Sequence, residues 1–191
     1  MTPPDWPAGE YVPEPTPGDV RKRELIATVE AMPAKLANLV IGLTPDQLDR
    51  KYKNWTIRQI VHHLADSHIN MFCRYRLALT EENPEIRPYD ETKWSELIDN
   101  RTMDIGPSLA ILSAVHARWV VLLKSMTPEQ FRRTYMHPEY KKVFTLDEAL
   151  GMYAHHGRHH TAQIEWVIAN RNRLPDAQAT VNAITVACAS G

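Results

Sequence analysis

Cysteine is scarce in this chain, which has only Cys73 and Cys188 in 191 residues. The two lie far apart and form neither a metal-binding nor a redox pair, so a reducing compartment is the simplest environment. No run of about 18 consecutive apolar residues occurs, as a membrane span would require. The proline-rich, acidic N-terminus lacks the apolar segment of a signal peptide. We therefore expect a cytoplasmic protein that does not span a membrane.

An excess of charge of either sign is also missing, because 22 basic residues face 23 acidic ones and the net charge is −1. No basic stripe accompanies the aromatic residues, so we expect neither nucleic acid nor an anionic membrane as a partner. What is present, 43% hydrophobic and 24% charged residues, is typical of a soluble globular protein. The length suits one domain with a full-sized core better than two small ones.

Apolar residues recur at helical spacing in four long segments. The expected helices span 19–42, 56–79, 108–125 and 145–172. Thr56 with Gln59, and Thr145 with Glu148, form capping boxes at the start of the second and fourth helices. Pro33 should kink or split the first helix. The sequence thus predicts an all-α four-helix bundle.

Two segments near the helix connections resemble each other. TPDQLDRKY (44–52) and TPEQFRRTY (127–135) share five of nine residues, and each precedes a helix that carries histidines. Thr-Pro followed by an acidic residue is also a common helix start, yet the agreement in order, turn and histidine placement favours an approximate two-fold repeat. Between the second and third helices lies a long excursion, 80–107, with a short helix expected near 91–98. A loop or small hairpin is expected at 133–144.

The flanks divide the chain into three parts. Residues 1–18 contain six prolines and should form an extended arm, which Trp6, Tyr11 and Val12 could pin to the domain or which could stay mobile. Residues 19–172 form the bundle. Residues 173–191 lose both charge and helical period, and we interpret them as a tail.

A dense histidine run, HHGRHH at 155–160, is the clearest functional signal. Residues four apart on a helix share a face, so the run offers two stacked pairs. The apolar stripe of the fourth helix places His156 and His160 inward, and His155 and His159 toward solvent or beside the site. Two imidazoles in an apolar stripe are costly unless both bind one cation.

A third ligand is needed for a catalytic metal site, and the second helix offers His62, His63 and His68. His62 is expected to point away from the core, His68 lies in the apolar stripe, and His63 lies on its polar flank. Spacing alone leaves His63 and His68 about equal, and a core histidine without a metal is the commoner explanation for either.

Polar residues follow His63 along the same face: Ser67, Asn70 and Arg74. Such a stripe predicts a lined cavity, although a solvated helix edge is more common. Together with Asp66, these residues are candidates to orient the ligands or to hold an anionic substrate group. His137 and Tyr89, in the connecting loops, are candidates for the rim of a pocket.

Several motifs together resemble the DinB superfamily, and most of all its YfiT-like branch of metal-dependent hydrolases. They are WPAGEY (6–11), WTIRQIVHHLADSH (55–68), RPYD (87–90), WSEL (94–97) and HxxxHxxQ (156–163). The resemblance covers about residues 6–170. It implies a four-helix bundle that holds nickel or zinc through His63, His156 and His160. Ala162 departs from the pattern, since many members have glycine there.

The implied activity is hydrolysis of a small-molecule substrate by a divalent metal that activates water. Other members of the superfamily resemble S-transferases that use a low-molecular-weight thiol such as bacillithiol, and a non-catalytic metal-binding stress-response protein is a further alternative. The last alternative is a patch of histidines that takes up and releases protons without binding any metal. Neither an HExxH motif nor the ExxH pairs of di-iron proteins occur on the fourth helix. The sequence leaves open whether the protein forms a homodimer.

Overall fold

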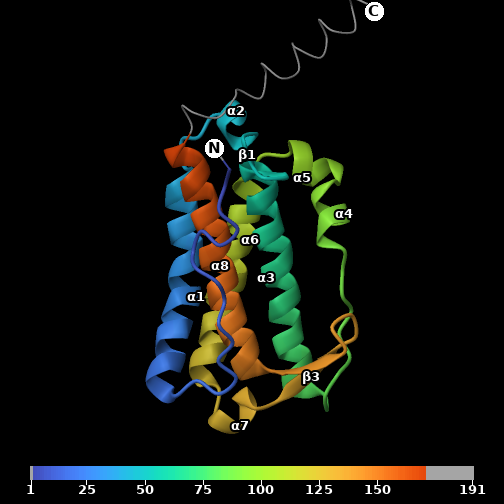
Figure 1. Cartoon of the computed structure of the whole chain (residues 1–191). Helices are drawn as coiled ribbons and strands as arrows, with labels where there is room; N and C mark the ends of the chain where they lie inside the picture. Colours follow the sequence, from blue (N-terminus) through green and yellow to red (C-terminus); the bar gives the residue numbers. More distant parts are fainter. Residues whose placement is uncertain (1, 171–191) are drawn as a thin grey trace, which may run out of the picture.

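The computed structural model describes residues 2–170 and contains a four-helix bundle (Figure 1). Its long helices are α1 (Asp19–Val40), α3 (Ile57–Thr80), α6 (Gly106–Ser125) and α8 (Leu146–Ala169). Both α1 and α3 pack against α6 and α8, so α1 and α3 occupy opposite corners of the bundle. The predicted all-α bundle is confirmed. The expected tail at 173–191 and the last residues of the predicted fourth helix lie outside the described residues.

The two similar segments fold alike. Each forms one helical turn, α2 (Pro45–Leu48) or α7 (Pro128–Phe131), opened by a threonine–glutamine capping box. An antiparallel hairpin follows each turn and leads directly into α3 or α8. The hairpins pair β1 (Lys51–Tyr52) with β2 (Trp55–Thr56), and β3 (Thr134–His137) with β4 (Lys142–Thr145). The repeat therefore includes a hairpin that the sequence did not predict at 51–56, where the strands are too short to show alternation.

The excursion between α3 and α6 contains two short helices, α4 (Glu91–Ser95) and α5 (Ile98–Thr102), where one was predicted. Both pack against α3, as Figure 1 shows. The side-chain amide of Gln59 on α3 donates to the carbonyl of Ser95 at 2.9 Å, and the side-chain amide of Asn100 donates to the carboxylate of Asp66 on α3 at 3.4 Å. The excursion is thus held to the bundle by buried polar groups.

The N-terminal segment before α1 forms no helix and lies across α8 (Figure 1). Tyr52 donates a hydrogen bond to the carbonyl of Pro4. The Trp6 ring lies 5.6 Å from the His159 ring, and the Tyr11 ring lies 5.2 Å from the His155 ring. Val12, by contrast, is 79% exposed and pins nothing. The arm therefore covers the outer side of the helix that carries the histidine run.

Pro33 does not split the first helix, since α1 continues from Asp19 to Val40. Proline has no backbone N–H, so the carbonyl of Val29, four residues earlier, receives no bond from the helical ladder. A side chain of α6 takes the place of that donor: Nδ1 of His116 lies 2.7 Å from the Val29 oxygen. Pro33 thus leaves the Val29 carbonyl free inside the bundle, and His116 donates a hydrogen bond to it.

The core consists of two apolar clusters with histidines between them. One cluster includes Trp119, Tyr75 and Leu150, and the other includes Leu36 and Ile57. In each of α3, α6 and α8, residues of one cluster precede the histidines and residues of the other cluster follow them. The histidines are buried or half-buried and form a layer between the clusters. That layer consists of His63, His68, His116, His156 and His160. The bundle thus has a polar layer across its middle.

Helix α6 is the one helix of the described residues that is long and apolar enough to cross a membrane by length and composition. His116 and Arg118 interrupt its apolar residues, so it contains no continuous apolar run of the length of a membrane span. The helix contributes Trp119, Leu123 and His116 to the interior of the bundle. A core helix of a bundle has the same length and composition, so these two properties do not by themselves imply a membrane span.

The capping boxes should hold the starts of the two histidine-bearing helices. Replacing Thr56 by alanine removes the hydroxyl that accepts a hydrogen bond from the backbone N–H of Gln59 at 3.1 Å. We expect the free energy of unfolding to fall by about 1 kcal/mol, as measured in urea. Thr145→Ala should have a similar effect on α8, whereas Thr56→Ser should lose little. An unchanged Thr56→Ala protein would contradict this role.

Candidate metal centre

Three histidines from two helices converge in the polar layer. His63 comes from α3, His156 and His160 come from α8, and one nitrogen of each lies within 4.8 Å of the others. The Nε2 atoms of His63 and His156 are 3.2 Å apart. The His156 and His160 rings, one helical turn apart, have centroids separated by 4.5 Å. The structure thus brings together the three histidines that the sequence proposed as ligands.

Burial keeps these imidazoles neutral. It lowers the pKa of His63 to about 4, and it lowers the pKa values of His156 and His160 well below the usual 6.5. Mutual repulsion of the positively charged forms lowers the last two further. At neutral pH each ring therefore retains one nitrogen with a free lone pair, which is the form that binds a metal.

The lone pair of His160 is oriented by Gln163. The Nδ1–H of His160 donates to the Gln163 Oε1 at 2.8 Å, and the Gln163 amide donates to Nε2 of His159 at 2.9 Å. A neutral imidazole has one N–H, so Nε2 of His160 is left as an acceptor. The ring also lies near the Trp55 indole, whose plane is only 15° from its own.

A chain of hydrogen bonds fixes the tautomer of His156. The Val29 carbonyl can only accept, so Nδ1 of His116 donates to it and Nε2 of His116 accepts. Nδ1 of His68 then donates to His116 at 2.8 Å, and Nδ1 of His156 donates to Nε2 of His68 at 3.3 Å. The lone pair of His156 must therefore lie on Nε2, the nitrogen that faces His63.

This donor set fits a divalent metal of the zinc or nickel type. Imidazole nitrogens suit both metals, and zinc binds them at about 2.0–2.1 Å. In a tetrahedral site, such bonds place two ligand nitrogens about 3.4 Å apart. The 3.2 Å between His63 and His156 is close to that value. Three protein ligands also leave a coordination position for water or a substrate.

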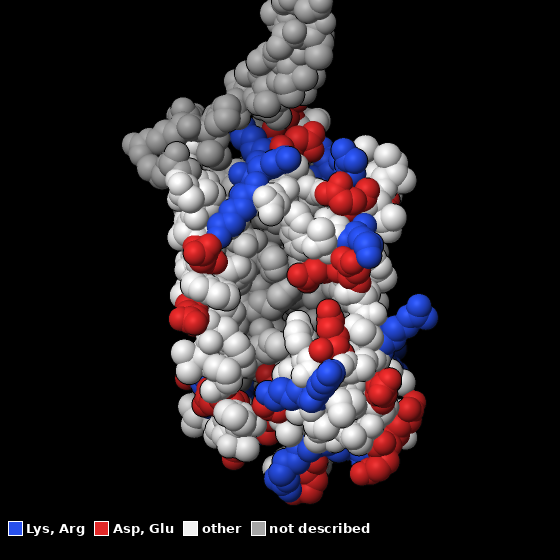
Figure 2. All heavy atoms as spheres, turned by 45° about the vertical axis from the view of Figure 1, so that its right-hand side comes forward, with Lys and Arg blue, Asp and Glu red and all other residues white. Residues whose placement is uncertain are grey.

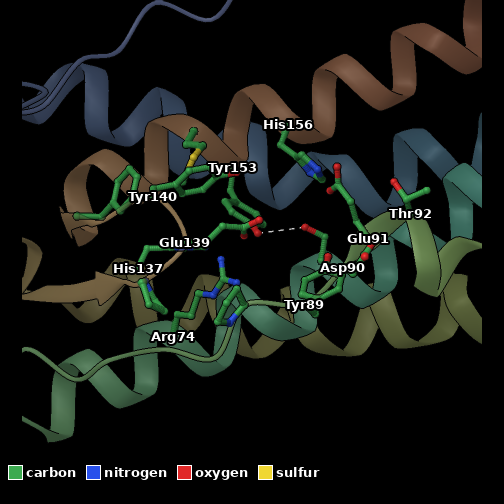
Figure 3. Close-up of a pocket in the computed structure, with 15 residues that line it drawn as sticks. Arg74, Tyr89, Asp90, Glu91, Thr92, His137, Glu139, Tyr140, Tyr153 and His156 are labelled. Atoms are coloured by element: carbon green, nitrogen blue, oxygen red, sulfur yellow. Dashed lines mark hydrogen bonds between the residues drawn. The ribbon is translucent and has the colours of Figure 1, made fainter.

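A cavity of about 660 Å³ opens beside this cluster. Figure 2 shows a hollow on this face with acidic side chains along its margin, and the exposed acidic residues that line the cavity are Asp90, Glu91 and Glu139. The close-up in Figure 3 shows His156 at one side of the cavity, and Arg74 with His137 across from it. The candidate metal centre is therefore reachable by a small molecule.

Of the four polar candidates on α3, two line the cavity and two do not. Ser67 and Arg74 line it, and the Ser67 hydroxyl lies 3.0 Å from that of Tyr153. Asn70 instead donates back to the Asp66 carbonyl at 2.8 Å. The Asp66 carboxylate receives a bond from Asn100 at 3.4 Å, and burial raises its pKa. Tyr89 and His137, the expected rim residues, both line the cavity.

Two of the other histidines are more buried than the sequence suggested. His62 is buried, with Nδ1 at 2.7 Å from the Ser108 hydroxyl, because the excursion and the start of α6 cover that face of α3. His155 is also buried, since the N-terminal arm lies over it and the Gly9 carbonyl is 2.9 Å from its Nε2. His68, the alternative third ligand, lies behind His156 and not within the cluster of three.

Sequence reasoning missed His116 altogether. It is the sole histidine of an apolar helix, and its spacing gives no hint of a partner. The available signal was Pro33. A proline inside a helix predicts a carbonyl without its helical donor, but it does not identify the side chain that donates to that carbonyl instead.

His116 should support the metal from two residues away. Replacing it by alanine removes the acceptor of His68 and frees the His156 tautomer, so we expect metal affinity to fall about 10–100-fold. The measurement is competition with a chromophoric chelator. His62→Ala removes another buried histidine that is outside this hydrogen-bond chain, and its affinity should stay near that of the wild type. Equal affinities for all three proteins would contradict the role.

The metal-free protein should lose stability in acid. The pKa values of the buried histidines are lowered on folding, so below about pH 6.5 the unfolded chain binds more protons than the folded one. The free energy of unfolding should then fall by up to about 1.4 kcal/mol per pH unit for each such histidine. For His63 the fall should end near pH 4. Urea unfolding between about pH 7.5 and 5 measures this, and His63→Ala should flatten the dependence.

Comparison with known proteins agrees with this geometry. The DinB superfamily profile matches residues 28–164. The Bacillus subtilis protein named "Putative metal-dependent hydrolase YfiT" is 48% identical over 161 residues, which cover 83% of this chain and 90% of that protein. OB0782 of Oceanobacillus iheyensis, named in the same way, is 43% identical over 83% of this chain and 92% of its own length.

A solved structure of YfiT, described as a "probable metal-dependent hydrolase with an unusual four-helix bundle topology", superposes with a TM-score of 0.83. It is 46% identical, and the match covers 88% of this chain and 96% of that one. Sequence profile, relatives and fold agree: the chain belongs to the DinB superfamily.

Proposed function

We propose that this protein is a metal-dependent hydrolase whose nickel or zinc ion is held by His63, His156 and His160. The observation that carries the proposal is the cluster of three neutral imidazoles beside an open cavity. The names of the relatives agree with it. A purely structural metal site would normally be closed by a fourth protein ligand, and this cluster contains three.

The metal would polarise a substrate carbonyl and lower the pKa of a bound water. The protein must then supply a group that takes the proton of the attacking water. Figure 3 shows the Glu91 side chain directed toward His156 across the cavity. Burial, followed by repulsion from Glu139 and Asp90, raises the pKa of Glu91 and makes it a better base. We assign the role of general base to Glu91.

Hydroxyl groups complete the wall near His156. Ser67 and Tyr153 share a hydrogen bond of 3.0 Å, and Tyr89 lies on the same cavity. Burial raises the pKa values of Tyr89 and Tyr153, so both phenols stay protonated at neutral pH and can donate to a substrate oxygen. These hydroxyls would orient the substrate and stabilise negative charge that develops on its oxygen.

The same three imidazoles would leave a bound metal its full positive charge, which also suits a thiolate ligand. Transfer from a low-molecular-weight thiol such as bacillithiol is therefore the alternative function. The two chemistries differ in one requirement, because transfer consumes the thiol and hydrolysis does not need it.

The test is turnover by the metal-loaded protein with and without a thiol. An activated ester should be hydrolysed without thiol, and chelation of the metal should abolish turnover. Glu91→Gln should lower kcat by about 100-fold or more while it keeps one equivalent of metal. Glu82→Gln, at an exposed glutamate that does not line the cavity, is the matched control and should stay near wild type.

Two results would contradict this assignment. Turnover of an electrophile only in the presence of bacillithiol or glutathione would favour transfer. Retention of one equivalent of metal by the His156→Ala/His160→Ala protein would show that the metal binds elsewhere.

A further inference from the structure

The side of the cavity across from His156 contains a largely buried arginine that has no partner among the described residues. Arg74, on α3, is only 8% exposed and lines the cavity. Within residues 2–170, no side chain or carbonyl forms a hydrogen bond or an ion pair with its guanidinium. Figure 3 shows that the guanidinium points into the cavity. A guanidinium carries its charge permanently, so an unpaired one in a protein interior is costly.

Two further polar groups of β3 lie unpaired in the same region. The hydroxyl of Tyr135 and Nδ1 of His137 are buried, and neither has a hydrogen-bond partner among the described residues. Burial raises the pKa of the Tyr135 phenol and lowers the pKa of the His137 imidazole, and the nearby charge of Arg74 acts to lower both. Arg74 and His137 line the cavity, whereas Tyr135 is fully buried and does not line it.

Acidic residues line the same cavity but form no ion pair with Arg74. Asp90, Glu91 and Glu139 line the cavity, yet none of them forms an ion pair with Arg74. They lie at the partly exposed margin of the cavity. Buried polar groups normally have partners, so the unpaired Arg74 and His137 at one end of the cavity indicate that a ligand supplies the missing acceptors.

We propose that Arg74 and His137 form a subsite for a substrate carboxylate. The planar guanidinium fork matches a carboxylate with two parallel hydrogen bonds. The walls between this subsite and His156 are largely aromatic and include Tyr89, Phe144 and Tyr153. The acidic margin opposes ligands with more than one negative charge, which disfavours phosphate esters. The substrate class is therefore a monocarboxylate with an apolar or aromatic middle.

This inference rests on the proposed function only for the other end of the substrate, whose labile bond would lie at the candidate metal centre. Binding of the carboxylate itself does not need the metal. It can therefore be measured on the full chain in both the metal-loaded and the metal-free form.

The experiment titrates 3-phenylpropionate and its neutral amide, 3-phenylpropionamide, into both forms and measures Kd by calorimetry. In each form the acid should bind at least tenfold more tightly than the amide. Arg74→Met should remove that preference, and Arg74→Lys should restore part of it. His137→Phe, which removes the ring nitrogens at the same end of the cavity, should weaken acid binding severalfold. These variants should keep one equivalent of metal.

Arg76→Met is the matched control, because Arg76 is on the same helix but exposed, with its guanidinium 5.1 Å from the Phe72 ring. Its Kd values should equal those of the wild type. The proposal is wrong if Arg74→Met binds the acid as tightly as the wild type in the metal-free form, or if acid and amide bind equally. Tighter binding of phenyl phosphate than of the acid would also overturn it. Loss of metal binding with acid binding intact would instead refute only the proposed function.

Discussion

A buried imidazole needs a partner for each of its nitrogens, and five buried or half-buried imidazoles lie in one layer of this bundle. The layer begins at Pro33, which leaves the Val29 carbonyl without its helical donor. His116 donates a hydrogen bond to that carbonyl, His68 donates to His116, and His156 donates to His68. This chain passes through all four long helices, and each bond fixes the direction of the next. The free nitrogen of His156 is thus determined by a proline on another helix.

The same requirement links the candidate site to the fold. The two apolar clusters hold the four helices together and turn the apolar stripes of α3 and α8 toward the interior. The polar layer further constrains that rotation, because His63 must face α8 and His156 must face both His63 and His68. The stability of the bundle and the geometry of the ligands are therefore not independent, and substitutions such as His116→Ala change both.

Much of this could be predicted from the sequence, for physical reasons that also explain the failures. Helical period placed His156 and His160 on the inner face of α8, because that stripe depends only on local geometry. Period could not choose between His63 and His68, since both face the interior, and only the resemblance to a family favoured His63. The burial of His62 and His155 could not be predicted, because the excursion and the N-terminal arm cover them, and such long-range contacts leave no trace in periodicity. Arg74 was identified as part of a polar stripe beside the core, but its lack of a partner among the described residues is visible only in three dimensions.

Helix α3 carries both His63 and Arg74, which are eleven residues apart on one continuous helix. At 1.5 Å per residue their backbones are about 16 Å apart along its axis. A single rigid element therefore sets the separation between the two ends of the cavity, and no hinge lies between them to adjust it. Helix α3 therefore fixes this separation. A molecule too short to reach from one end of the cavity to the other can occupy either end but not both.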